Sequence, residues 1–191
     1  KHYYPLEFYV AIFNQQPMGF YNLETLKEDA KRHGVRILHP DLNRSLRKAI
    51  SLQGDLLLGF LNIRSIGHSV SDMIVNQRLK YGQFHSVANF IERIDISRIN
   101  LENLVNAGIF DSINVSRRDT LWEASLHLKR KEAGKESLEI ALPQDFVQLP
   151  LQSSWDNMMN EYEAMGLHPE GHVIAHLRGY VKEYQGLKKS N

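Results

Sequence analysis

Hydrophobic residues near the start of the chain recur with helical spacing and are followed by short β-prone runs. Apolar positions between residues 6 and 13 repeat every three or four residues behind Pro5, which is favoured in a first helical turn, and the pattern stops before Gln16-Pro17. Asn22 is placed to cap a second amphipathic helix that ends before Gly34. The sequence therefore predicts two helices within the first 34 residues.

Three short β-prone runs come next. Val35–Leu38 is the first, and turn residues end it after His39. Ala49–Leu52 and Leu56–Leu58 flank Gln53-Gly54-Asp55, a spacing that predicts a small β-hairpin. None of these runs is long enough to predict a large sheet.

The apolar run that begins at Gly59 breaks at Ser65–Gly67 and resumes with helical spacing at Val70, Met73 and Ile74. This pattern predicts a helix, a tight hairpin and a second helix. Small residues in the hairpin let backbone N–H groups approach an anion, and the start of the following helix adds partial positive charge. The pattern resembles the hairpin of helix-hairpin-helix DNA-binding modules, which usually have glycine where this chain has Ser65.

A second turn of the same kind follows. Ser86 begins one predicted helix, and Ser97 caps another that ends at Gly108. The turn Gly108–Asn114 then leads to Ser116, which stands three residues before Asp119 as in a capping box. A last helix is predicted from a cap at Ser154 to Gly166. The predicted fold class is mainly α, with a helical first part, tandem helix-hairpin-helix motifs and one small β-hairpin.

Composition limits the chemistry. The net charge is +1 with neutral histidines, so any contact with nucleic acid is expected to be local. There is no cysteine, which excludes disulfides and thiolate metal ligands and agrees with a cytoplasmic location. No apolar run has membrane-spanning length, and no membrane partner is expected. The chain starts at Lys1 inside an apolar helical pattern, which indicates a piece of a longer protein.

No active site is recognisable. The sequence lacks a paired-aspartate motif, a phosphate-binding glycine-rich loop and a serine-histidine-aspartate set with its usual turn. His168 and His172 suggest a metal, but they have no third ligand nearby in the sequence and are more typical of a turn or of packing. No catalytic residue, cofactor or metal site is therefore predicted in this chain.

Seven segments stand in a recognisable order along the chain: His2–Tyr21, Asp29–Val35, Pro40–Ser45, Gly82–Val87, Leu104–Asp111, Arg117–Ala124 and Tyr162–His172. In this order they resemble the bacterial C-family DNA polymerases, the alpha subunit of DNA polymerase III and its relatives, over about residues 1–178. The run Gln16–Tyr21 is more similar to the error-prone, translesion branch than to the main replicative enzyme.

The resemblance implies an order of parts along the chain. Residues 1–45 would end the fingers region, 46–132 would form the tandem helix-hairpin-helix region, and 133–153 would be a linker. Residues 154–178 would close this region before an oligonucleotide-binding domain, and 179–191 would be a polar tail. The family's catalytic aspartates and their divalent metal ions lie in a palm domain that precedes all of these parts, so the parent would be a DNA-directed DNA polymerase and this piece non-catalytic. After Ser45 the family's usual Asp-Trp is absent.

The predicted function is duplex DNA binding without sequence preference, in replication or error-prone translesion synthesis. One phosphate is expected at the first turn and another at the second, and these contacts position the duplex. The predicted contact residues are Arg64, Ser65, Ile66, Gly67, His68, Ser116, Arg117 and Arg118. The alternative is a protein-interaction module in which the helices and the segment Leu138–Leu151 dock polymerase accessory proteins.

Overall fold

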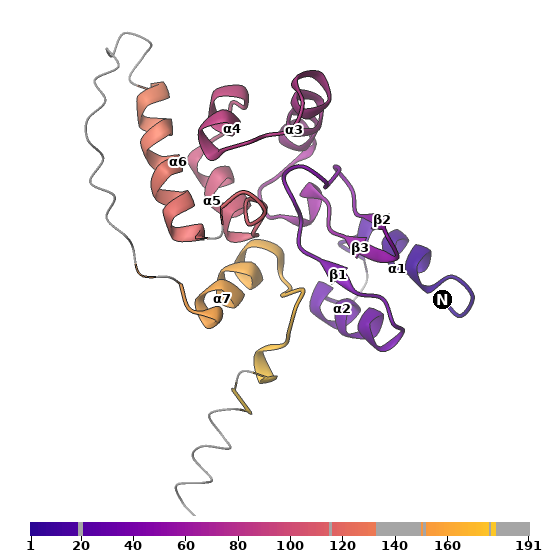
Figure 1. The fold of residues 1–191 in the computed structure, drawn as a ribbon. Helices are drawn as coiled ribbons and strands as arrows, with labels where there is room; N and C mark the ends of the chain where they lie inside the picture. The colour runs from indigo at the N-terminus through magenta and orange to yellow at the C-terminus, as the bar shows by residue number, and fades with distance from the viewer. Residues whose placement is uncertain (19–20, 115, 133–149, 151, 176, 179–191) are drawn as a thin grey trace, which may run out of the picture.

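The computed structural model describes residues 1–18, 21–114, 116–132, 150, 152–175 and 177–178. The described part is mainly α-helical with one small sheet, which confirms the predicted fold class (Figure 1). The predicted linker at 133–153 lies mostly outside the described residues, and the predicted tail at 179–191 lies wholly outside them. In chain order the elements are α1 Pro5–Asn14, α2 Leu23–Arg32, β1 Ile37–Leu38, β2 Ile50–Leu52, β3 Asp55–Leu57, the 3-10 helix η1 Phe60–Asn62, α3 His68–Tyr81, α4 Val87–Arg93, α5 Arg98–Asn106, α6 Arg117–Glu132 and α7 Ser154–Met165.

Side-chain caps fix where several helices begin. Asn22, Ser86 and Ser97 each accept a hydrogen bond from the backbone N–H three residues later, as predicted. The cap of α7 is Ser153 and not Ser154, because Ser153 Oγ accepts the Asp156 N–H at 3.1 Å. The Asp156 carboxylate accepts the Ser153 N–H in return, so a reciprocal pair shifts the start of α7 by one residue.

The predicted β-hairpin is present, and a third strand, β1, joins it in one sheet. β2 and β3 pair antiparallel with Ser51 opposite Leu56, and both residues of the turn, Gln53 and Gly54, have positive φ. β1 pairs parallel with β3, with Ile37 opposite Leu56, so the strand order is β1-β3-β2. Only two residues of the predicted strand Val35–Leu38 enter the sheet.

The predicted helix before the first hairpin is wrong. That stretch is the single 3-10 turn η1, because β3 extends to Leu57 and the backbone beyond it pairs with the segment that precedes β2. Phe60 N–H donates to Leu46 O and Leu61 N–H to Arg47 O, both at 3.0 Å. In a longer helix these two N–H groups would donate to carbonyl oxygens of the helix itself, so the pairing prevents a longer helix here. The first motif therefore consists of β3, η1, the hairpin and α3.

Gly59 is the point where these two backbone segments come closest. A Cβ atom at Gly59 would lie 2.3 Å from the carbonyl carbon of Lys48 and 2.7 Å from the amide nitrogen of Ala49. Replacing Gly59 with alanine is expected to lower the free energy of unfolding by about 1–3 kcal/mol, because the backbone must move apart. Urea unfolding measures this loss. The matched change Gly67→Ala, at a site with no atom within 4 Å of the added Cβ, should leave stability nearly unchanged.

One hydrophobic core joins the described elements. Its buried members run from Tyr9 on α1 to Leu167 after α7. α1 packs on α2, α4 and α5 pack on α6, and α5 also contacts α7. In the centre Phe90 makes edge contacts with Phe84 and Phe110, with ring centroids 5.3 and 5.2 Å apart. Core residues lie on both sides of the predicted boundary between residues 45 and 46. The domain boundaries given above therefore stay predictions.

Among the described residues, no helix has both the length and the apolar character that a bilayer-spanning segment needs.

Candidate nucleic-acid interface

The first hairpin is an exposed turn with one buried anchor. Arg64, Ser65, Gly67 and His68 are exposed, whereas Ile66 is 4% exposed and belongs to the core. The side chain of Ile66 therefore anchors the turn in the core, and the residues on either side of it are exposed to solvent. Of the five residues predicted here as phosphate contacts, four are accessible.

Two other helices fix the position of this hairpin. Arg64 N–H donates to Ala164 O on α7 at 2.8 Å. Asn103 Nδ2 on α5 donates to Arg64 O at 3.2 Å. Figure 1 shows the ends of α5 and α7 meeting beside the chain that leads to α3. The hairpin is thus held by residues that lie 39 and 100 positions later in the sequence.

The start of α3 offers free backbone donors. Gly67 is its N-cap residue and no side chain caps the helix. Within the part of the chain that the structure describes, the N–H groups of Gly67, His68 and Ser69 have no acceptor. The Ser71 hydroxyl lies 3.0 Å from Gly67 O and 2.9 Å from His68 O and keeps the first turn in place. Free N–H groups at a helix start, together with the helix dipole, form an anion-binding site.

Ser65 adopts the conformation that the usual glycine would adopt. Its φ is +64°, in the left-handed region, where a Cβ atom is unfavourable. A left-handed residue within a turn directs successive N–H groups to one side, as in the anion-binding arrangement called a nest. Ser65 therefore adopts a backbone conformation that favours glycine, and its Cβ atom adds local strain.

Replacing Ser65 with glycine is expected to raise the free energy of unfolding by about 0.5–1 kcal/mol, because the relief of strain exceeds the added entropy of the unfolded chain. Chemical denaturation measures the change. The opposite substitution, Ser65→Val, should destabilise the protein, since a β-branched side chain is poorly tolerated at positive φ. Equal stability of all three proteins would show that Ser65 is not strained.

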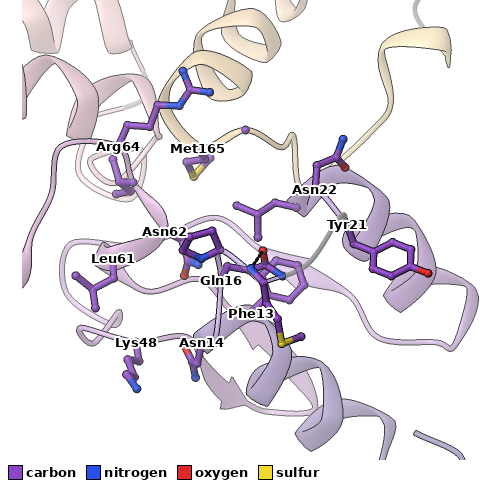
Figure 2. Close-up of a pocket in the computed structure, with 15 residues that line it drawn as sticks. Phe13, Asn14, Gln16, Tyr21, Asn22, Lys48, Leu61, Asn62, Arg64 and Met165 are labelled. Carbon is purple, nitrogen blue, oxygen red and sulfur yellow. Dashed lines mark hydrogen bonds between the residues drawn. The ribbon is translucent and has the colours of Figure 1, made fainter.

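Two unpaired cations lie beside the hairpin. Arg64 and Lys48 line one pocket of about 460 Å³, whose other walls include Phe13, Gln16 and Met165 (Figure 2). Figure 2 shows Arg64 at the pocket edge with its guanidinium directed away from Phe13 and Gln16. Among the described residues neither cation makes an ion pair. Lys48 could not be predicted as part of this pocket from the sequence, because the backbone pairing of residues 46–47 with η1 connects segments that no local pattern links.

In the second turn, unlike the first, several backbone N–H groups are already hydrogen-bonded within the protein. The N–H groups of Ile109, Asp111, Ile113 and Asn114 all donate to carbonyl oxygens within the motif. At the start of α6, Ser116 Oγ accepts the Asp119 N–H at 3.2 Å, as the predicted capping box requires. Acidic groups are present as well, Asp111 in the turn and Asp119 in the first helical turn, whereas the first turn of α3 has no acidic residue. These features disfavour an anion at Ser116.

Arg117 requires a correction. The sequence analysis expected it to support a phosphate, but it is 6% exposed and its donors are already used. Nη2 lies 2.6 Å from Asp111 Oδ2 and 2.7 Å from Glu161 Oε1, and Nη1 donates to Asn106 O at 3.2 Å. Arg118 is half-buried and donates to Pro150 O at 2.8 Å. The partners of Arg117 include a residue 44 positions later, which no local pattern could reveal.

Comparison with protein families identifies the type of motif in this region. A family model described as a helix-hairpin-helix motif matches residues 34–120, a range that contains both turns. The match includes the sheet, so the first motif's strand and η1 lie within the family pattern.

Curated relatives match nearly the whole chain. This chain is 31% identical to the error-prone DNA polymerase of Corynebacterium glutamicum over 96% of the length of the chain. The error-prone DNA polymerases of Anaeromyxobacter sp. strain K and Bdellovibrio bacteriovorus are 34% and 33% identical over 93% and 95% of the chain. The chain covers only 17%, 16% and 18% of the length of these three relatives. These matches confirm the resemblance to bacterial DNA polymerases.

Proposed function

We propose that this chain, which is homologous over nearly its whole length to one segment of bacterial error-prone DNA polymerases, binds duplex DNA without sequence preference. The observation that supports this function best is the exposed, uncapped start of α3 beside the hairpin Arg64–His68. Backbone N–H groups there are free to donate hydrogen bonds to the oxygens of a phosphate, and a phosphate is present at every nucleotide whatever the base.

The contact begins at the first hairpin. The N–H groups of Gly67, His68 and Ser69 donate to one phosphate, and the exposed Arg64 adds a charge next to it. Lys48, on the wall of the adjoining pocket, is placed for the neighbouring phosphate. The second turn is left out of the contact because four of its amides are paired and Asp111 and Asp119 would repel an anion. One hairpin therefore binds DNA and the other supports it.

In this proposal the chain is a segment of a longer protein. That protein is a DNA-directed DNA polymerase acting in replication or error-prone translesion synthesis in the bacterial cytoplasm. This segment would hold the duplex and leave catalysis, with its divalent metal ions, to a palm domain elsewhere in that protein. Docking of accessory proteins is the alternative function, and the segment that suggested it, Leu138–Leu151, lies outside the described residues apart from Pro150.

Fluorescence anisotropy with labelled duplexes tests the proposed function. Two duplexes of equal length and unrelated sequence should bind with dissociation constants that agree within about twofold and are weaker than micromolar at physiological salt, since few phosphates are contacted. A preference above tenfold for one sequence would contradict the proposal. Absence of binding to both duplexes by folded protein would favour the accessory-protein function.

A further inference from the structure

Three side chains that commonly bind metals meet between the end of β1 and α7. His39 follows β1, Glu161 lies on α7, and His168 lies in the segment after α7. Glu161 Oε2 is 2.9 Å from His39 Nε2 and 2.5 Å from His168 Nδ1. One nitrogen or oxygen atom from each residue lies within 4.8 Å of the others.

Hydrogen bonding leaves this cluster incomplete. His39 Nε2 is buried and makes no hydrogen bond within the described residues, although it is close to the Glu161 carboxylate. A buried nitrogen without a hydrogen bond is costly, and it is uncommon in folded proteins. An ion that accepts the lone pair of this nitrogen would remove that cost.

The surroundings favour a cation. The cluster lines a pocket of about 780 Å³ whose wall contains four carboxylates and only two guanidinium groups. These charged groups are Asp41, Asp111, Glu161, Glu170, Arg44 and Arg117. The Glu161 carboxylate contributes its oxygen Oε2 to the cluster, and its other oxygen, Oε1, lies 2.7 Å from Arg117 Nη2.

We propose that His39, Glu161 and His168 bind one transition-metal ion. Two imidazole nitrogens and one carboxylate oxygen form a ligand set typical of Zn²⁺, whereas Mg²⁺ and Ca²⁺ prefer sites made of oxygen alone. The pocket leaves room for a water molecule at a fourth position. Arg117 binds the other oxygen of Glu161 at 2.7 Å and orients the carboxylate from outside the ligand set.

The position of the ligands indicates what the ion would do. It would tie α7 and the segment after it to the end of β1, next to the buried Arg117 that anchors the second turn. The sequence analysis found no third ligand for His168 because His39 is 129 positions earlier. His172, the other histidine considered there, is not in the cluster, and its Nε2 lies 3.9 Å from Glu24 Oε1.

Metal analysis of the 191-residue chain tests the proposal. The protein is incubated with ZnCl₂, dialysed, and assayed for zinc by mass spectrometry, and its melting temperature is measured with ZnCl₂ and with EDTA. The expected result is about one zinc per chain and a melting temperature about 5 °C higher at saturating zinc, from the linkage of binding to folding. Co²⁺ in place of zinc should give the visible absorption of a four-coordinate site.

A matched pair of variants identifies the ligands. His39→Gln removes the least buried ligand, whose side chain is 21% exposed, and leaves the Glu161–Arg117 pair in place, so the protein should stay folded by circular dichroism and lose the bound zinc. His85→Gln changes an exposed histidine elsewhere and should retain the zinc. Folded wild-type protein that binds no zinc, or His39→Gln protein that binds as much as the wild type, would overturn the proposal.

Discussion

Replacing Arg117 with methionine is expected to lower the free energy of unfolding by about 3–5 kcal/mol, the loss typical of breaking a buried ion pair from one side. The guanidinium lies within 2.7 Å of both Asp111 and Glu161, and Glu161 is 2% exposed. Methionine replaces the apolar stem of the arginine side chain and lacks the guanidinium, so the loss reflects mainly the uncompensated carboxylates and the free Asn106 carbonyl.

The control for this change is the neighbouring arginine. Arg118→Met removes a half-buried side chain with one hydrogen bond to Pro150 O, and it should change stability by less than about 0.5 kcal/mol. Urea denaturation of both variants provides the comparison. If Arg117→Met were as stable as the wild type and had lost DNA affinity, Arg117 would be a phosphate contact, as the sequence alone predicted.

Replacing Gly67 with glutamate is expected to weaken duplex binding by about a hundredfold while the protein stays folded, because the new carboxylate lies beside the phosphate. Gly67 has a φ of −90°, which any residue adopts, and no atom lies within 4 Å of an added Cβ. An acidic side chain at the start of α3 is also favourable for the helix itself. The change should therefore act on binding and not on folding.

Two further variants separate the hairpins. Gly67→Ala adds volume without charge and should bind DNA nearly as well as the wild type. Ser112→Glu places the same charge on the exposed part of the second turn, where no phosphate contact is proposed, and should leave affinity unchanged. A loss of affinity in Ser112→Glu as large as in Gly67→Glu would mean that both hairpins contact the duplex, as the sequence analysis expected.

Local features of the fold were predictable from the sequence where neighbouring residues determine them. The caps at Asn22, Ser86 and Ser97 depend on residues three positions away, and the β2-β3 turn depends on Gln53-Gly54. The helix predicted before the first hairpin was wrong because the pairing of η1 with residues 46–47 competes with local propensity. Such pairing leaves no periodic signal.

The candidate site was predictable only in part for the same reason. The hairpin at Ser65–Gly67 follows from small residues beside a helical pattern, and the structure places it at the surface. Whether a cation is free depends on distant partners, and Arg117 is paired with Glu161 whereas Arg64 has no ion pair among the described residues. That Lys48 lines the same pocket as Arg64 likewise became apparent only in the folded chain.

The measurement that tests the central claim most directly is the salt dependence of duplex affinity for the wild type and for Gly67→Glu. With two phosphates contacted, the logarithm of the wild-type affinity should fall against the logarithm of salt concentration with a slope of about −2, and the variant slope should be shallower by about one unit. A wild-type slope near zero, or identical slopes in two folded proteins, would contradict binding through the first hairpin.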